Sequence, residues 1–520
     1  MALEYRLTDP NYTIYHRAAL GGLAATIRAW GDSPPEGITP ELQQDFVGIY
    51  WSDELTDQEA LRRILAASFQ ISTEKITEGM LLLPGHFIGP ERDDLRLLIH
   101  NGLCLTFLQH PKMRPGPKEA RKFELKTADD ETGNLLTYKA IETYAHQKAQ
   151  GTGLLDEPKN AKKSQEANGQ FPLIATIPQS VIPGAMTGKK SLQAKADEAI
   201  LLLFLMVGCS VFLLRPRTYQ EKAQACLVVP DVVDLIKFAR GIKRLAVAGK
   251  DFEGFSNTYL GRVVGGAEEA ALRFLMDIYA AEIGSDRSVA GCQAIAMGKV
   301  AWDKNQVNRS ISVKVGGDYP EIGVFKAAYQ YLGHSKLIKT KKGESFAIPA
   351  SPVPELIAAN LAAKRHWGAH FTELVSDKKD FKQMLFSHKG LNQMAKAVKD
   401  DLDKTIIRAF HKAWEMTMGE LGERARKDKL DFSRLVEVRR EKIRNEILRS
   451  KTSDALAGWF LRFCADATKG AALPPLRDDA DRIRSLIFTP RYFERFQNLL
   501  LFALVSYAGN ESKTDTHKGE

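Results

Sequence analysis

Residues 381–414 read FKQMLFSHKGLNQMAKAVKDDLDKTIIRAFHKAW, and apolar side chains recur in this stretch at every third or fourth position. That spacing predicts amphipathic α-helix, with a break near Gly390. Three further segments keep the same spacing: 431–450, 453–469 and 490–507. The strand pattern disappears after about residue 355, so the sequence predicts an α-helical bundle for this part of the chain.

These predicted helices are strongly basic. Residues 377–469 contain 22 lysines and arginines against 15 aspartates and glutamates, an excess close to the net charge of +9 carried by all 520 residues. Positive charge held on helices, rather than on a flexible tail, indicates a surface shaped to follow a polyanion such as nucleic acid.

The preceding part of the chain mixes strand and helix patterns. Thr13 is placed to cap a helix over residues 14–30, and β-rich stretches occur at 171–177, 224–229 and 310–315. Prolines 349, 352 and 354 mark a boundary. We therefore predict an α+β protein, with a mixed α/β domain at 1–354, a basic helical bundle at 355–508 and a flexible tail at 509–520.

The longest uncharged run, 199–214, is shorter than a membrane-spanning helix and is interrupted by Gly208. We expect a helix that enters a core, followed by a buried strand that ends before Arg215 and Pro216. The five cysteines are scattered and contain no C-x-x-C pair, which favours buried thiols in a reducing compartment. The N-terminus lacks a secretory signal pattern. These features predict a cytoplasmic protein without a membrane partner.

A basic loop at 112–126 is a first candidate site. Lys112, Arg114, Lys118, Arg121, Lys122 and Lys126 face only two glutamates there. Prolines 111, 115 and 117 stiffen its first half, which favours a finger over a coil. The finger is suited to contact phosphate, and an ordinary solvated loop is the alternative.

A glycine turn at 184–191 is a second candidate. It resembles a phosphate-binding loop, but only three residues separate its glycines, and Lys190 stands where a magnesium-binding Ser or Thr is needed. Nucleotide hydrolysis is therefore disfavoured. Lys189 and Lys190 suit contact with a nucleic-acid backbone, and a plain surface turn is the alternative.

The segment 302–309 combines Trp302 with Asn305, Gln306, Asn308 and Arg309. Aromatic rings stack on bases, amides read base edges and arginine grips phosphate, although a buried Trp beside a polar turn fits equally well.

Histidines 366 and 370 have the spacing of metal ligands, but Trp367 stands where a zinc protease needs glutamate, and no third ligand is evident. We expect packing or surface histidines, no metal, no cofactor and no catalytic residue.

Several segments together resemble the large subunit of type I CRISPR effector complexes (Cascade), most closely the MYXAN subtype, which is related to types I-A and I-B. The segments are YRLTDP at 5–10, YHRAALGGL at 15–23, VGCSVFLLR at 207–215, LVVPDV at 227–232 with FAR at 238–240, GKVAW at 298–302 with Gln306 and Arg309, and LLLFALVSY at 499–507. The resemblance covers nearly the whole chain, and each motif in it is short.

The resemblance implies a non-catalytic subunit of a complex that carries a CRISPR RNA (crRNA). Its mixed domain would recognise the protospacer-adjacent motif (PAM) of double-stranded target DNA and open the duplex, and its bundle would lie along the separated strands. Amides and hydroxyls suit base edges, so Gln179, Ser180, Asn305, Gln306 and Asn308 are candidates for reading the motif, with Lys189, Lys190 and Arg309 on phosphates.

The implied partners are crRNA, target DNA, the backbone, 5′-handle-binding and small subunits, and either a helicase-nuclease or transposition proteins. In some related systems an internal start releases the bundle as a free small subunit, and Met384, Met394 and Met416 lie where such a start would fall. Two alternatives stay open: a stand-alone nucleic-acid-processing enzyme, and a nucleic-acid-binding scaffold unrelated to CRISPR.

Overall fold

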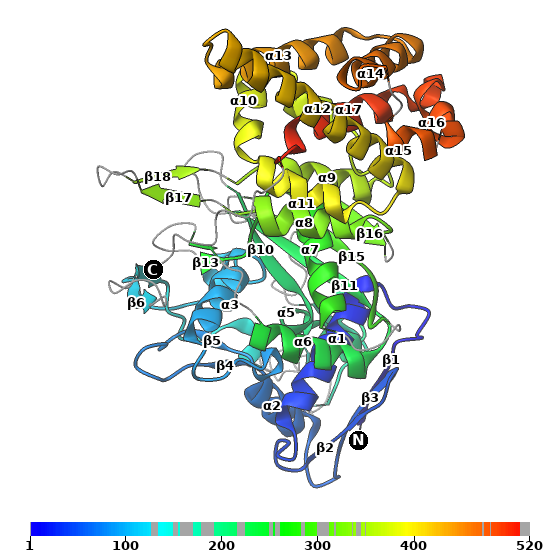
Figure 1. Ribbon diagram of the computed structural model, residues 1–520. Coiled ribbons are helices and arrows are strands. Elements are labelled where there is room, and N and C mark those ends of the chain that lie inside the picture. Colours follow the sequence, from blue (N-terminus) through cyan, green and yellow to red (C-terminus); the bar gives the residue numbers. More distant parts are fainter. Residues whose placement is uncertain are drawn as a thin grey trace. The chain divides into compact units, whose positions relative to one another are not determined.

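The structure is a computed structural model that divides into two compact units, 1–317 and 318–520. It describes residues 2–125, 134–148, 154–155, 170–177, 192–215, 224–248, 253–254, 260–281, 287–298, 311–316, 319–334, 336–339, 345–348, 350–470, 473–478 and 480–509. The predicted α+β class is confirmed, because helices and sheets mix in the first unit and helices dominate the second (Figure 1).

The compact units divide earlier than the boundary that we expected at residue 354. Helix α8 (Ile322–Leu332) packs against α9 (Val353–Ala362) and α11 (His388–Ala397). The approach is close at Gly390, where a Cβ atom would lie 2.3 Å from Leu332 Cδ2. Burial of α8 against these helices therefore places it, with the hairpin β17 (Lys336–Lys339) and β18 (Ser345–Ile348), in the second unit.

The first unit contains seven α-helices and sixteen strands among its described residues. The helices are α1 (Ile14–Trp30), α2 (Asp57–Ser68), α3 (Asp93–Leu105), α4 (Ala196–Leu202), α5 (Leu205–Gly208), α6 (Leu235–Ala248) and α7 (Ala267–Ala280). The strands are β1 (Ala2–Arg6), β2 (Ile38–Leu42), β3 (Phe46–Trp51), β4 (Gln70–Ile71), β5 (Leu81–Leu82), β6 (Arg121–Leu125), β7 (Asn134–Tyr138), β8 (Ala175–Thr176), β9 (Gln193–Ala194), β10 (Ser210–Leu214), β11 (Ala225–Val232), β12 (Glu253–Gly254), β13 (Leu260–Gly261), β14 (Val263–Val264), β15 (Val289–Ala296) and β16 (Ile311–Gly316).

Helix α1 begins where the sequence predicts. Thr13 and His16 form a reciprocal capping box at its N-terminus, which satisfies backbone groups that the first turn leaves free. The helix then packs tightly on α5 through two glycines: a Cβ on Gly208 would lie 1.9 Å from the carbonyl oxygen of Ala18, and one on Gly22 would lie 2.2 Å from that of Phe204. Side chains at these positions would force the two helices apart.

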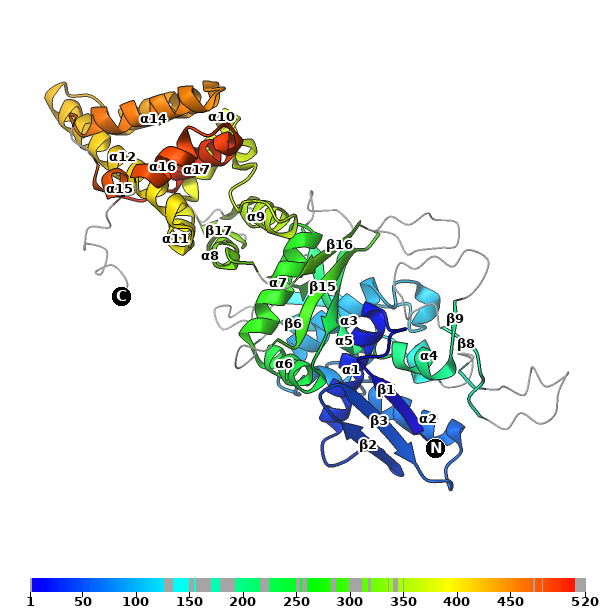
Figure 2. The same ribbon diagram turned by 90° about the vertical axis from the view of Figure 1, so that its right-hand side faces the viewer.

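The uncharged run 199–214 forms core, as predicted. It supplies parts of α4 and α5 and then strand β10 of a five-stranded sheet with the order β14-β10-β11-β15-β16. Strands β10 and β14 are parallel, and the other neighbours are antiparallel. Figure 2 shows α7 alongside this sheet, and it contacts β15 and β16. A second sheet, β1-β3-β2, is antiparallel.

The basic loop is more ordered than the sequence indicates. Residues 121–125 form β6, which pairs with β7, and α3 extends to Leu105. Phe123 and Leu136 are both buried in a cluster with Met80 and Leu97. Side chains on one face of a hairpin alternate along each strand, and this burial fixes the register of the pair. The described part of the loop expected at 112–126 is therefore corrected: a 3₁₀ turn (Pro111–Met113) overlaps its start, and strand β6 occupies residues 121–125.

The second unit is the predicted bundle. Its remaining helices are α10 (Lys378–Phe386), α12 (Asp401–Lys427), α13 (Phe432–Arg449), α14 (Ser453–Ala467), α15 (Pro474–Asp478), α16 (Ala480–Ile487) and α17 (Phe493–Ser506). The break expected near Gly390 is confirmed at Ser387, between α10, which ends at Phe386, and α11, which begins at His388. Helix α12 then begins at Asp401 with Asp400 as its cap. Ile406, Phe410 and Trp414 of α12 are fully buried and form part of its core.

All five cysteines are buried and unpaired, as predicted. No helix in the described part of the chain is long and apolar enough to cross a bilayer.

Candidate nucleic-acid interface

The basic finger of the first unit is partly anchored to the protein. Arg114 donates from Nε to the carbonyl oxygen of Leu108 at 2.7 Å, and Arg121 pairs with Glu78 at 2.9 Å. Lys112, Lys118 and Lys122 are exposed and form no ion pair within the described ranges. The two arginines thus anchor the segment to the protein. The side chains of the three lysines stay available to contact an anion such as phosphate.

The other predicted contact residues lie outside the described residues. They are Gln179, Ser180, Lys189, Lys190, Asn305, Gln306, Asn308 and Arg309, together with Lys126 of the finger.

Each of the two spaced histidines lies beside a carboxylate. His366 Nε2 lies 2.6 Å from Asp403 Oδ2, and His370 Nδ1 lies 3.1 Å from Glu373 Oε1. Among the described residues, no group of three or more His, Cys, Asp and Glu side chains is placed to hold a metal ion. The structure agrees with the expectation of packing and surface histidines.

A second group of exposed cations among the described residues lies where α12 ends and α13 begins. We call this segment, residues 424–434, the basic hairpin. Its exposed cations are Arg424, Arg426, Lys427, Lys429 and Arg434. Lys427 is in the last turn of α12, where the negative end of the helix dipole favours a cation. Four residues connect the helices, and the backbone of Lys429 is in the left-handed region with φ of 53°.

Ion pairing distinguishes the basic hairpin from four other lysines of this unit, whereas Lys379, Arg449, Lys451 and Arg462 are also exposed and have no carboxylate partner among the described residues. Four lysines elsewhere are neutralised: Lys378 by Glu441 at 2.8 Å, Lys382 by Glu437 at 2.5 Å, Lys404 by Asp401 at 3.8 Å and Lys412 by Glu415 at 2.7 Å. In the basic hairpin, Arg424 lies 3.5 Å from Asp428. The other four cations have no carboxylate partner in the part of the chain that the structure describes.

Apolar side chains accompany these cations. Phe432 is 39% exposed and Leu430 is 46% exposed. The Phe432 ring lies beside Gly422 of α12, where a Cβ would be 3.7 Å from the ring. Exposed cations beside an accessible aromatic ring suit a single strand, because phosphates pair with the cations and a base stacks on the ring.

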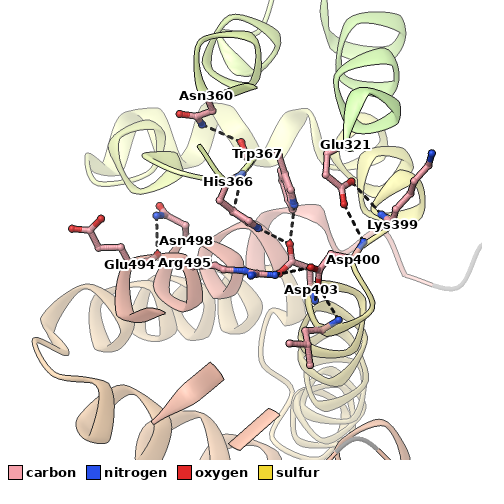
Figure 3. A network of polar contacts seen from close by, with 12 residues as sticks. Glu321, Asn360, His366, Trp367, Lys399, Asp400, Asp403, Glu494, Arg495 and Asn498 are labelled. Carbon is pink, nitrogen blue, oxygen red and sulfur yellow. Dashed lines mark hydrogen bonds and ion pairs between the residues drawn. The ribbon is translucent and has the colours of Figure 1, made fainter. Parts of the chain in front are cut away.

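A buried polar network holds the opposite end of α12 (Figure 3). Asp403 is fully buried and lies 2.9 Å from Trp367 Nε1, 2.6 Å from His366 Nε2 and 2.6 Å from an Arg495 guanidinium nitrogen. Burial alone raises the pKa of a carboxyl, but the His366 and Arg495 contacts outweigh it and hold the pKa of Asp403 below its ordinary value.

Two further carboxylates complete this end of the helix. Asp400 caps α12 by accepting from the backbone N–H groups of Leu402 and Asp403, and it also pairs with Arg495 at 3.1 Å. Glu321 accepts from the backbone N–H groups of Lys399 and Asp400. Helix α12 has 27 residues, roughly 40 Å in length, so the network fixes the base of a long helix that carries the basic hairpin at its other end.

Sequence reasoning located the positive charge but missed both the hairpin and the network. The net charge of a helix can be counted from its sequence. Whether each of its cations forms an ion pair depends on carboxylates that come close only in the folded chain. Lys378 and Glu441 are one such pair. Asp403 and Arg495 are 92 positions apart, and no local pattern relates them.

Comparison with known proteins finds a family match in each part of the chain. Residues 4–203 match the DevT N-terminal domain, and residues 395–520 match the DevT C-terminal domain. The chain belongs to the DevT family. The matched C-terminal DevT segment includes α12, the basic hairpin and Arg495, and the matched N-terminal segment includes the basic finger.

This DevT chain is similar to the CRISPR-associated protein Cas8a1/Csx13 of Myxococcus xanthus strain DK1622. The two are 26% identical over 393 residues, which cover 71% of this chain and 63% of the relative. The chain thus matches less than two thirds of the length of that relative. The resemblance to the Myxococcus-type CRISPR large subunit, drawn from short motifs, is confirmed.

Proposed function

We propose that this chain is the large subunit of an RNA-guided CRISPR effector complex and that it holds nucleic acid without cutting it. The observation that carries the proposal is the basic hairpin, a folded cationic surface in a DevT-family chain, in which four of the five cations have no carboxylate partner among the described residues. Association with phosphate is driven by release of counterions, so cations without internal partners contribute most to it.

Each of the two units would have its own role in recognising target DNA. The first unit would recognise the PAM and help to open the target duplex, with the basic finger on the DNA backbone. The second unit would stabilise the R-loop by holding a separated strand on the basic hairpin. Pairing between guide and target would supply most of the specificity, as in another RNA-guided effector. The complex would then recruit a helicase-nuclease or transposition proteins.

The proposal predicts which molecules accompany the chain in its native cells. Tagged full-length chain should co-purify with RNAs of uniform length that contain CRISPR repeat sequence, and with backbone and 5′-handle-binding subunits. Sequencing the RNA and identifying the proteins by mass spectrometry would test this. Recovery of the chain alone, or with RNAs of random origin, would favour an unrelated scaffold. Magnesium-dependent cleavage by the purified chain would favour a nuclease.

An internally started small subunit would have to begin earlier than the methionines suggest. A product that starts at Met384, Met394 or Met416 would lack His366 and Trp367, which hydrogen-bond the buried Asp403. We therefore propose that a stable free helical subunit begins before His366.

A further inference from the structure

Helix α6 of the first unit contains four cations and no aspartate or glutamate. Its apolar side chains, among them Leu235 and Phe238, are buried, and the helix packs against α1 and α7 (Figure 1). The exposed residues among its described side chains are Arg240, Lys243 and Arg244. We call these three residues the α6 face. The proposed function has so far given this face no role.

The cations of the α6 face have no carboxylate partner in the part of the chain that the structure describes. Lys237, one turn earlier on the same helix, differs because it pairs with Asp234 at 3.4 Å. Arg240 is three positions from Lys243 and four from Arg244, so its side chain neighbours both, with Cβ atoms about 5–6 Å apart. Like charges at this spacing destabilise a helix, and a bound polyanion would remove that cost.

Two of these cations are held in place by contacts that leave their charge free. The Lys243 ammonium lies 5.8 Å from the centre of the Phe87 ring, within the range of cation–π attraction. Arg244 donates from Nη1 to the backbone carbonyl oxygen of Ala281. Neither contact supplies a negative charge. Both cations are therefore able to pair with an anion, and part of the entropy cost of ordering a long side chain is met before binding.

The residue beneath Lys243 has a strained backbone. Phe87 has φ of 54°, in the left-handed region that bulky residues seldom adopt. It ends the 3₁₀ turn Pro84–His86, and its N–H donates to the carbonyl oxygen of Pro84. Strain of this kind is concentrated at functional sites. The turn brings the Phe87 ring to Lys243, so the strained residue supports the α6 face.

The chemistry of this face favours nucleic acid over a protein partner. The buried core of a protein interface is rich in aromatic and apolar side chains and poor in charge, whereas every exposed side chain described on α6 is a cation. Arginine and lysine are common partners of phosphate. Helix α6 contains no amide or hydroxyl side chain to read base edges, so the contact would be independent of base sequence.

We propose that the α6 face binds the phosphate backbone of a nucleic-acid strand, RNA or DNA, without reading its bases. Arg240, Lys243 and Arg244 meet the phosphates, and Phe87 acts as a positioning residue for Lys243. This inference rests on the proposed function, because it gives the first unit a backbone contact in addition to the basic finger.

Fluorescence anisotropy of the purified full-length chain with labelled single-stranded RNA and DNA of one mixed sequence tests the proposal. The three cations of the α6 face are changed together to glutamine. Three lost phosphate contacts should flatten the log–log salt dependence by about 2, so the fall in affinity between 50 and 200 mM salt should become about 20-fold smaller. The strand that shows the change, RNA, DNA or both, is the one that the face binds.

Arg62→Gln, Arg63→Gln and Arg92→Gln together form the matched control, because Glu59 and Asp94 already pair with these arginines. The control should leave the salt dependence unchanged. Phe87→Leu should weaken binding about two- to tenfold at an unchanged slope, because Lys243 keeps its charge and loses only its ordering. Phe87→Tyr should restore the affinity.

Equal slopes for the α6 variant and the wild-type chain on both strands would overturn the proposal, as would equal flattening in the control. Loss of another subunit from the assembled complex, with unchanged slopes, would assign the face to an acidic protein partner and would also overturn it. The proposed function is tested separately by the RNA and subunits that co-purify with the chain, so the two failures are distinguishable.

Discussion

Replacing Asp403 by alanine is expected to destabilise the second unit by about 3–5 kcal/mol. The carboxylate is fully buried and lies within hydrogen-bonding distance of His366, Trp367 and Arg495. Its removal would leave the ring nitrogens of His366 and Trp367 without this acceptor and Arg495 with only the partly exposed Asp400 as a carboxylate partner. Breaking a buried hydrogen-bond and ion-pair network is among the largest single-residue costs. Urea unfolding, followed by hydrogen exchange in peptides of residues 353–506, would measure the loss.

Asp401→Ala is the matched control. Asp401 also lies in the first turn of α12, but its side chain is 70% exposed and its partner Lys404 is 3.8 Å away. Exposed pairs of this kind contribute about 1 kcal/mol or less. Equal losses for the two variants would mean that the helix dipole, and not the buried network, accounts for the effect.

The first unit is expected to be destabilised by mild acid more strongly than the second. Burial lowers the pKa of His86 and His100 to about 4 and that of His146 to about 3. These histidines are neutral in the folded state, whereas an unfolded histidine takes up a proton below about pH 6.5. Stability is therefore retained above that pH and lost as the pH falls toward 4.

The expected loss of folding stability is large because three buried, neutral histidines lie in the first unit. Each contributes about 1.4 kcal/mol per pH unit within the window. In the second unit, His411 is the corresponding buried histidine, with its pKa lowered to about 4 by burial. Hydrogen exchange at pH 7.5, 6.0 and 5.0 would compare the two units. Equal loss of protection in the two units as the pH falls would contradict the attribution of the acid effect to these histidines.

His146→Phe provides a control for the acid effect. Neither ring nitrogen of His146 has a hydrogen-bond partner among the described residues, and the ring packs against Phe69 at 5.2 Å between centroids. An apolar ring of similar size should therefore preserve the packing. The variant should show about one third less pH dependence in the first unit without a loss of stability at pH 7.5.

The features that the sequence predicted correctly are local ones. Helix α1 depends on Thr13 and on the periodicity of the residues after it, and the change from α5 to β10 follows from a change of pattern within the run 199–214. The errors concern contacts between distant residues. Phe123 and Leu136 belong to a hairpin because they share a core with Met80 and Leu97.

For the candidate interface, too, the sequence predicted a local property and missed one that depends on distant contacts. An excess of basic residues is a property of composition and was predicted. Which cations remain free is set by tertiary pairing, as when Glu437 and Glu441 of α13 neutralise Lys382 and Lys378 of α10. The periodicity of apolar residues does not separate these lysines from those of the basic hairpin.

The most direct test of the account is the salt dependence of target-DNA binding by the assembled complex with four cations of the basic hairpin changed to glutamine: Arg426, Lys427, Lys429 and Arg434. A matched variant removes the same number of charges at the ion-paired positions Lys378, Lys382, Lys404 and Lys412. The account predicts that the hairpin variant flattens the log–log slope by about 0.7–0.9 for each phosphate that the hairpin no longer neutralises, while the matched variant changes it little. An unchanged slope in the hairpin variant, or equal flattening in both, would show that the hairpin does not hold nucleic acid.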